Sequence, residues 1–314
     1  KVIKDKFNMK PNIVAPNVAG GGNTLFDTRA AAGNLGDIVI IGSGSGQAEK
    51  VVKSKLVTDL SSYIKNTKYL KTYQGAIDQL TKDANQESGM WGIPTSVSSL
   101  SPTESSEGVE PTFGPFVRWD YYKEIGYPKV ATLEDLLPVL KQMQDKAREE
   151  TGSDDVYALS LFKDWDDQAM QNGFQLPAFY GYAEGTGYVM SNADGTDAQS
   201  LIDENGVYVR ALKFYNKAEQ MGLVDPESTT QNYDTMYSKY KEGKILFSFW
   251  PWLGQAAYNT DAHKKDGKGF MMLSIDDMKI ASKGAQPNGT TTFIGVGEKA
   301  KNKERLVKFI DWLY

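Results

Sequence analysis

Residues 243–252 read Gly-Lys-Ile-Leu-Phe-Ser-Phe-Trp-Pro-Trp. Five of the six residues from Ile245 to Trp250 are apolar, which predicts a strand that is buried on both faces. Pro251 cannot donate a further ladder hydrogen bond, so the strand ends there. Trp250 and Trp252 therefore lie at the carboxyl end of a buried strand, where open α/β sheets place their ligand sites.

The two indoles have two possible roles. Tryptophan is highly buried on average, so core packing is the simpler interpretation of either ring alone. A pair on either side of a proline favours the rim of a binding site. Rigid, flat rings there suit an apolar or sugar-like ligand face better than a reacting group, and we expect either ring to be replaceable with little loss of folding.

Length and composition restrict the class of protein. A chain of 314 residues exceeds one comfortable hydrophobic core, so two lobes are expected. Its 40% hydrophobic and 24% charged residues are ordinary for a globular protein. The net charge of -5, without a basic tract, argues against a broad nucleic-acid surface. No apolar run reaches the ~18 residues of a membrane-spanning helix.

Residue usage also argues against catalysis. The chain has no cysteine, which excludes thiol chemistry, disulfides and cysteine-based zinc sites. Its single histidine, His263, lies in a polar turn that does not favour a catalytic triad. The sequence therefore predicts no catalytic residue, no metal site and no cofactor.

Strands and helices alternate along the chain, which predicts an α/β protein with mainly parallel sheets. Thr132 and Asp135 form a capping box at one helix start, and Gly222 ends another helix. Asn302 is expected to cap the last helix, with Leu313 among its inward residues. The predicted strands are 11–14, 37–41 and 157–162, and the predicted helices are 48–56, one that follows the capping box, 208–221 and one that follows Asn302.

Three local motifs each allow a functional and a structural interpretation. Residues 42–46 resemble the dinucleotide-binding motif Gly-x-Gly-x-x-Gly, but Gln47 occupies the position of the third glycine. The remaining interpretations are a flexible loop at a cleft edge and a loose phosphate-binding nest. The acids of 164–167 suit hydrogen bonds to a ligand or a solvated turn better than a glycosidase pair or a calcium loop. Residues 192–197 resemble part of an EF-hand, and a plain turn is favoured.

Seven segments, in order, resemble the signatures of extracellular solute-binding proteins of family 1, the receptors of carbohydrate ABC importers. Residues 36–40, 57–61 and 90–95 are similar to the motifs PDIV, DLS and YGIP. Residues 117–126 resemble the R-x-D-W-L-x-x-L-G crossover of the oligosaccharide, or LplA-like, branch. The remaining matches are 222–226, 241–244, and 295–297 with the last helix.

The resemblance implies a two-lobe, type II periplasmic-binding-protein-like fold, in which each lobe has a mainly parallel sheet flanked by helices. The lobes close on a ligand about hinge crossovers. Lobe 1 is expected at 1–115 plus 273–289, lobe 2 at 119–268 plus 292–314, and the crossovers near 116–119, 269–272 and 291–294. The resemblance also implies a monomer at the extracellular face of the membrane or in the periplasm, with a lipid anchor upstream of this chain and further helices downstream.

The same resemblance implies which side chains bind the ligand. Sugars present C–H faces to aromatic rings and hydroxyl rims to polar side chains. Lobe 2 is expected to supply Trp250, Trp252, Trp165 and Arg118, with Asp164 or Asp166. Lobe 1 is expected to supply Ser43, Ser45, Thr95 and Ser96.

The implied function is a non-catalytic receptor that binds a sugar or oligosaccharide between two lobes and delivers it to the permease of an ABC importer. One alternative is a receptor of the same fold for a peptide, a polyamine or a phosphate compound. Another is a glycoside hydrolase, which needs two carboxylates about 5–10 Å apart across the ligand, and the sequence shows no such pair.

Overall fold

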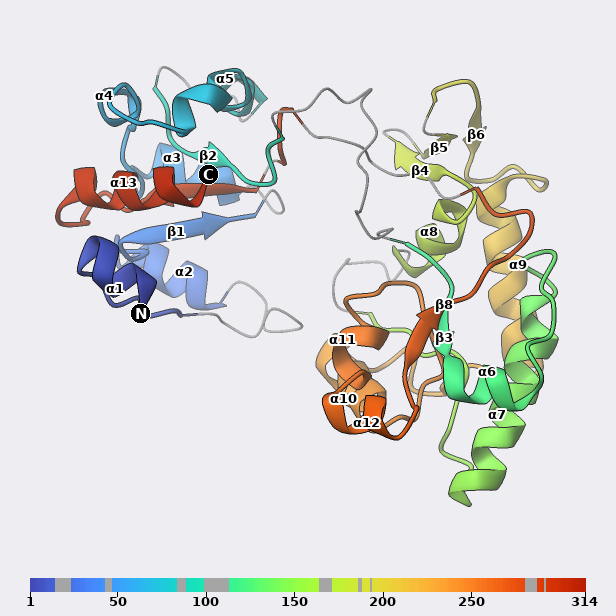
Figure 1. The fold of residues 1–314 in the computed structure, drawn as a ribbon. Helices are drawn as coiled ribbons and strands as arrows, with labels where there is room; N and C mark the ends of the chain where they lie inside the picture. Colours follow the sequence, from blue (N-terminus) through green and yellow to red (C-terminus); the bar gives the residue numbers. More distant parts are fainter. Residues whose placement is uncertain are drawn as a thin grey trace. The chain divides into compact units, whose positions relative to one another are not determined.

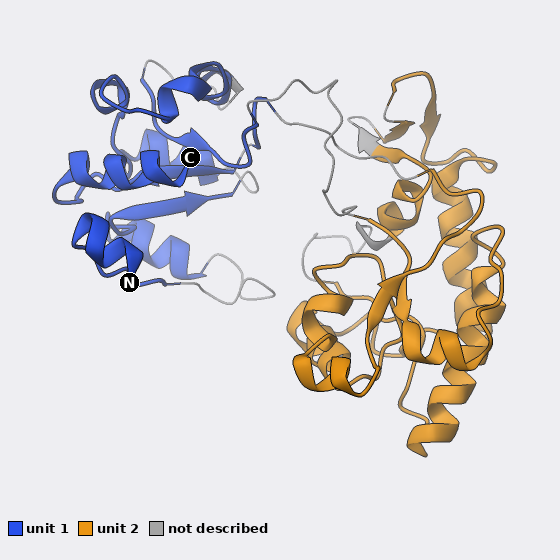
Figure 2. Ribbon diagram, viewed as in Figure 1, with its two compact units in different colours: residues 1–107, 283–314 blue, residues 108–282 orange. Residues whose placement is uncertain are grey.

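The computed structural model describes residues 1–14, 24–42, 47–83, 89–98, 113–163, 171–185, 188–192, 194–279, 287–290 and 292–314. The chain forms two compact units, drawn in Figures 1 and 2. Unit 1 contains residues 1–107 and 283–314, and unit 2 contains residues 108–282. None of the described helices is long and apolar enough to cross a membrane.

This division differs from the predicted lobes, which stay a prediction. The sequence placed 292–314 in the second lobe, but these residues belong to unit 1, while 273–282 belong to unit 2. The expected crossovers near 116–119 and 269–272 overlap strands of unit 2, and the one near 291–294 overlaps a strand of unit 1. Local patterns do not show which distant segment a strand pairs with, so the sequence could not decide this.

Unit 1 is built on the sheet β1-β9-β2 (β1 Ile38–Ile41, β2 Ile93–Pro94, β9 Phe293–Val296), with antiparallel pairing throughout. Its core includes Leu60, Ile77 and Ile310, all at most 2% exposed. The predicted strand at 11–14 has no regular structure. The helices are α1 (Val2–Phe7), α2 (Thr24–Ala31), α3 (Gln47–Lys53), α4 (Ser61–Ile64), the 3-10 helix η1 (Leu70–Tyr73), α5 (Gln74–Asp83) and α13 (Lys303–Leu313).

One buried carboxylate ties the last helix of unit 1 to its middle. Asp311 of α13 is 8% exposed. Its oxygens accept hydrogen bonds from the backbone N–H groups of Lys68, Tyr69 and Leu70 at 2.9, 2.7 and 2.8 Å. These N–H groups lie at the start of η1, where the helix itself offers them no partner.

Unit 2 contains two small antiparallel sheets, β7-β3-β8 and β4-β5-β6. Parallel contacts are isolated bridges, Tyr157 to Ile245 and Leu159 to Val224, so the described sheets are not mainly parallel as predicted. The strands are β3 (Phe116–Arg118), β4 (Tyr182–Gly185), β5 (Val189–Asn192), β6 (Ala198–Ser200), β7 (Phe247–Ser248) and β8 (Phe270–Met272). The helices are α6 (Trp119–Glu124), α7 (Leu136–Thr151), α8 (Gln171–Ala178), α9 (Val207–Gln220), α10 (Tyr233–Lys241), α11 (Gly254–Tyr258) and α12 (Asp261–Lys265).

The hydrogen bonds of the predicted capping box form in the turn before α7, and the predicted end of α9 is confirmed. The backbone N–H of Thr132 donates to Asp135 at 2.9 Å, and the backbone N–H of Asp135 donates to the Thr132 hydroxyl at 3.3 Å, before α7 begins. Gly222 follows α9 with φ +68°, a conformation that glycine adopts without strain. Asn302 makes no side-chain cap for α13, because it is itself left-handed, and Leu313 is 54% exposed.

We expect Asp311→Ala to lower the free energy of unfolding by about 3 kcal/mol, because it leaves one buried and two partly buried backbone donors without an acceptor. Urea unfolding followed by circular dichroism measures this. Glu304→Ala is the matched control, since its ion pair with Lys308 lies at the surface of the same helix. Equal losses of unfolding free energy in the two variants would show that the buried carboxylate contributes no more than a surface carboxylate.

Candidate ligand-binding site

The segment 245–250 runs through the core of unit 2, as the sequence predicts. Every residue from Ile245 to Trp250 is at most 4% exposed. The Phe247 N–H donates to the Ala158 carbonyl at 2.9 Å, and Phe247 also pairs with Val117 of β3. The regular strand is shorter than predicted, and after Pro251 the chain turns into α11.

The two tryptophans at the end of this segment lie in different environments. Trp250 is 4% exposed and belongs to the core, whereas Trp252 is 40% exposed. Their rings stack with centroids 4.7 Å apart and planes inclined by 22°. The buried indole therefore supports the exposed one from behind. The sequence analysis assigned both rings the same role, whereas the structure buries one and exposes the other.

Helix α10 adds two tyrosines beside Trp252. The Tyr233 ring lies 6.4 Å from Trp252, and Tyr237 stacks on Tyr233 at 5.7 Å with an interplanar angle of 20°. Both tyrosines are partly exposed. We call Trp252, Tyr233 and Tyr237 the aromatic platform. The sequence analysis missed the two tyrosines, although Asn232 is a suitable helix cap and its side chain accepts from the Thr235 N–H.

The Tyr233 hydroxyl keeps its proton at neutral pH. Burial, with smaller effects of Tyr237 and Asp234, raises the pKa of Tyr233 to about 12. A protonated phenol can both donate and accept hydrogen bonds. The platform therefore combines apolar ring surface with a neutral polar group.

A buried ion pair fixes α10 in unit 2. The Lys239 ammonium donates to Asp225 Oδ2 at 2.6 Å, and the Asp225 side chain is 1% exposed. Ser160 donates to the same oxygen at 2.7 Å. Burial by itself raises the pKa of Asp225, but the Lys239 and Ser160 hydrogen bonds outweigh it and hold the pKa below its ordinary value. Asp225 is therefore ionised and paired at neutral pH.

Arg118 lies inside unit 2 and not at a ligand surface. Its side chain is 2% exposed and forms a two-point pair with Asp120 at 2.9 and 2.6 Å. The guanidinium lies over the rings of Tyr121 and Tyr258, at 4.8 and 4.1 Å from their centroids. It also donates to the Gly243 carbonyl at 3.3 Å. These contacts give Arg118 a structural role in place of the expected ligand contact, because the side chain is buried and each of its three nitrogens already has an acceptor.

Two of the expected unit 1 ligand residues are described. Thr95 follows β2, and its hydroxyl lies 2.8 Å from that of Thr290 and 3.1 Å from the Thr292 carbonyl. Ser96 is exposed, with φ +56°. Their contact with a ligand stays a prediction. The other expected residues, Ser43, Ser45, Asp164, Trp165 and Asp166, lie outside the described residues.

No known family profile matches the chain. The lipoprotein LipO of Bacillus subtilis (strain 168) is 24% identical over 215 residues, which cover 65% of this chain and 37% of LipO. Among solved structures, the ABC-transporter substrate-binding protein FusA of Streptococcus pneumoniae in complex with kestose superposes with a TM-score of 0.61 and 15% identity. That match covers 100% of this chain and 62% of FusA.

This chain has the fold of ABC-transporter substrate-binding proteins. NgtS of Streptococcus pneumoniae, an N-glycan transport protein in complex with Man1GlcNAc, matches with a TM-score of 0.54 and 16% identity over 99% of this chain and 62% of NgtS. An HMO-binding protein of Bifidobacterium longum infantis matches with a TM-score of 0.51 and 19% identity over 92% of this chain and 58% of that chain. The predicted α/β, two-lobe substrate-binding fold is confirmed, and the chain spans under two thirds of these relatives.

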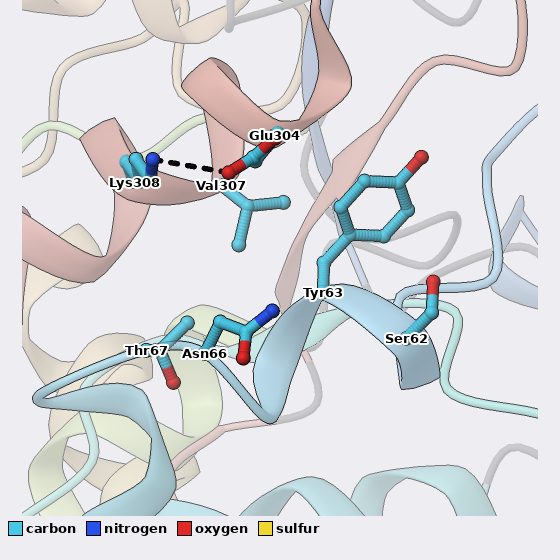
Figure 3. Close-up of a pocket in the computed structure, with 7 residues that line it drawn as sticks. All are labelled: Ser62, Tyr63, Asn66, Thr67, Glu304, Val307 and Lys308. Atoms are coloured by element: carbon cyan, nitrogen blue, oxygen red, sulfur yellow. Dashed lines mark ion pairs between the residues drawn. The ribbon is translucent and has the colours of Figure 1, made fainter.

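A hollow lies in unit 1, between α4 and α13 (Figure 3). Its volume is about 300 Å³. Among its described lining residues Tyr63 is the one aromatic side chain, and the Glu304–Lys308 ion pair, at 3.0 Å, lies on the α13 side. We prefer the aromatic platform as the ligand site, because this hollow has no stacked rings. It is lined by Ser62, Tyr63, Asn66, Thr67, Glu304, Val307 and Lys308.

The described residues contain no group of three His, Asp or Glu side chains that could hold a metal ion. His263 lies on α12, where its ring stacks on Tyr258 at 4.0 Å and its Nδ1 lies 2.6 Å from the Tyr258 carbonyl. These contacts describe a partly buried histidine that packs on the end of α11.

We expect Lys239→Met to destabilise the protein by about 3 kcal/mol at neutral pH, because it leaves the Asp225 carboxylate buried without its cation. A carboxylate whose pKa is lowered by folding stabilises the protein above its ordinary pKa, 3.8, and loses this effect as the pH falls through the folded value. The difference between the variant and the unmodified protein should therefore shrink below pH 3.8.

Urea unfolding at a series of pH values measures this difference. Lys217→Met, on an exposed position of α9, is the control and should change stability little at any pH. A Lys239→Met loss that is the same at acidic and neutral pH would contradict the ion-pair account.

Proposed function

We propose that this chain is part of a non-catalytic receptor that binds a sugar or oligosaccharide and delivers it to an ABC importer. The observation that carries the proposal is the aromatic platform, in which the exposed Trp252 ring is supported by Trp250 and adjoined by Tyr233. The C–H faces of sugar rings pack on such surfaces, and tyrosine hydroxyls pair with sugar hydroxyls. FusA with kestose and NgtS with Man1GlcNAc share the fold and support this ligand class.

The roles within the site differ from residue to residue. We assign direct contact with the ligand to Trp252 and Tyr233, and support of Trp252 to Trp250. Contacts from Trp165, Asp164 or Asp166, Ser43, Ser45, Thr95 and Ser96 remain part of the proposal. Enclosure of the ligand between two lobes, with hinge closure, also stays a prediction.

The proposed partners and location follow from the relatives. Substrate-binding proteins act with the permease of an ABC importer, so we propose that partner, with the protein a monomer at the extracellular face of the membrane or in the periplasm. The similarity to the lipoprotein LipO supports a lipid anchor on the whole protein. Membership of family 1, and of its LplA-like oligosaccharide branch, is part of the same proposal.

The alternative ligands have less support in the described residues. A phosphate or other anionic ligand needs available cations, and the one arginine expected at the site, Arg118, is already paired with Asp120 inside unit 2. No specific observation favours a peptide or a polyamine over a sugar.

We expect Trp252→Ala to weaken sugar binding about tenfold or more with little change in stability, since it removes an exposed stacking surface. Trp250→Ala should instead cost about 3–5 kcal/mol of stability, because that ring is buried. A thermal-shift screen of mono- and oligosaccharides that includes kestose identifies the ligand, and calorimetry gives the affinities.

Leu212→Ala is the control, because this side chain on α9 is 40% exposed, like Trp252, but lies outside the platform. It should change neither affinity nor stability strongly. Unchanged affinity in Trp252→Ala, with tight binding by the unmodified protein, would remove the platform as the ligand site.

We also expect the bound sugar to be released chemically unchanged. Hydrolysis needs an acid and a base with separated pKa values on two sides of the ligand. Incubation with the ligand from the screen, followed by chromatography, should show no product. Turnover that disappears in Asp164→Asn or Asp166→Asn would favour a glycoside hydrolase instead.

A further inference from the structure

A single buried hydroxyl organises the turn that carries both tryptophans of the site. Ser248, the last residue of β7, is 0% exposed. Its hydroxyl donates to the Trp250 carbonyl at 2.8 Å and accepts from the backbone N–H groups of Trp250 and Gly254, both at 3.2 Å. A serine hydroxyl has one hydrogen to donate and two lone pairs, so these contacts use its full capacity.

The far end of the turn is shaped to reach this hydroxyl. A Cβ atom at Gly254 would lie 2.8 Å from the Ser248 Cβ and 2.9 Å from a ring carbon of Phe270, closer than real side chains approach. Only glycine at this position lets the backbone N–H come within hydrogen-bonding distance of Ser248. The residues between, 249–253, include the buried Trp250 and the exposed Trp252.

The Ser248 bonds therefore close the base of the turn, while Pro251 stiffens its middle. Pro251 fixes one backbone angle and has no N–H. Trp252 follows this proline directly, so the direction of its indole depends on how the turn is closed. The stacking of Trp252 on Trp250 at 4.7 Å requires both rings to leave the turn on the same side.

We propose that Ser248 is a positioning residue for ligand binding, which holds Trp252 stacked on Trp250 in the orientation that receives the sugar. The role of Ser248 in sugar binding rests on the proposed function. Its role in holding the two tryptophan rings together does not. A merely structural serine would satisfy buried backbone groups and contribute to stability without determining the geometry of the Trp pair.

Ser248→Ala tests the proposal, because it keeps the size of the side chain and removes the hydroxyl. Closely stacked indoles give an exciton couplet in the far-ultraviolet circular dichroism spectrum, which reports the geometry of the pair without any ligand. Trp252→Phe removes one indole and therefore defines the intensity that the Trp pair contributes. We expect Ser248→Ala to lose most of that intensity. We expect the affinity for the sugar found in the thermal-shift screen to fall about tenfold.

Ser160→Ala is the matched control. Ser160 is also buried in unit 2, and its hydroxyl donates to the Asp225 side chain at 2.7 Å and accepts from the Gln231 side chain at 2.7 Å. Its loss should lower the melting temperature by an amount similar to the loss of Ser248, since both leave buried polar groups without a partner. The Trp couplet should keep its full intensity in this control.

Two further variants keep the test decisive. Gly254→Ala disrupts the hydrogen bond from the Gly254 N–H to the Ser248 hydroxyl at the other end of the turn. It should also weaken the couplet. Ser248→Cys retains a weak hydrogen-bonding group and should give an intermediate couplet and affinity, which also covers the case in which Ser248→Ala does not fold.

The outcomes distinguish the positioning role of Ser248 from the proposed function. A full couplet and unchanged affinity in folded Ser248→Ala or Ser248→Cys would overturn the positioning role. A couplet that weakens in these variants, in a protein that binds no sugar, would support the role of Ser248 in the turn and overturn the proposed function instead.

Discussion

The burial of residues 245–250 constrains the rest of unit 2. Neighbouring segments cover this stretch on both sides, through the bridge from Ile245 to Tyr157 and the pairing of Phe247 with β3. A buried backbone must find partners for all its polar groups. The Tyr240 hydroxyl donates to the Phe247 carbonyl at 2.6 Å, and Ser248 bonds the turn that follows. The chain can reach the surface only after these groups are satisfied, and it does so at Trp252.

Buried charges in unit 2 hold secondary structure in place. Arg118 links β3 to the Gly243 carbonyl, at the point where the buried segment begins. Lys239 links α10 to Asp225, after the segment that bridges to Leu159. Such pairs are strongly destabilising when one partner is removed, because the other charge stays buried. Both pairs fix the elements that carry the aromatic platform.

The candidate site follows from this arrangement. Trp252 lies at the end of the buried segment and Tyr233 at the start of α10, two elements that the core holds close together. The rings contribute surface and a neutral hydroxyl in place of charge. A sugar, which is uncharged and has both apolar faces and hydroxyl rims, is the ligand class that matches this chemistry.

The sequence by itself determined the features that depend on neighbouring residues. The apolar run of 245–250 is buried as predicted, the Thr132–Asp135 capping box forms before α7, and α9 ends before Gly222. Each of these signals acts within about four residues, through hydrogen bonds and backbone preferences that a local pattern displays. The two-lobe substrate-binding fold was instead implied by the resemblance of seven ordered segments to motifs of a known family, and the fold is confirmed.

Only the tertiary structure decided what depends on distant segments. It placed α13 in unit 1, gave the sheets antiparallel pairing, buried Trp250 while exposing Trp252, and brought Tyr233 beside them. It also paired Arg118 with Asp120, so that a residue expected at the ligand became part of the core. The physical reason is that burial and pairing are properties of the contact between segments, and residues far apart in the sequence carry no local signal of which of them will meet.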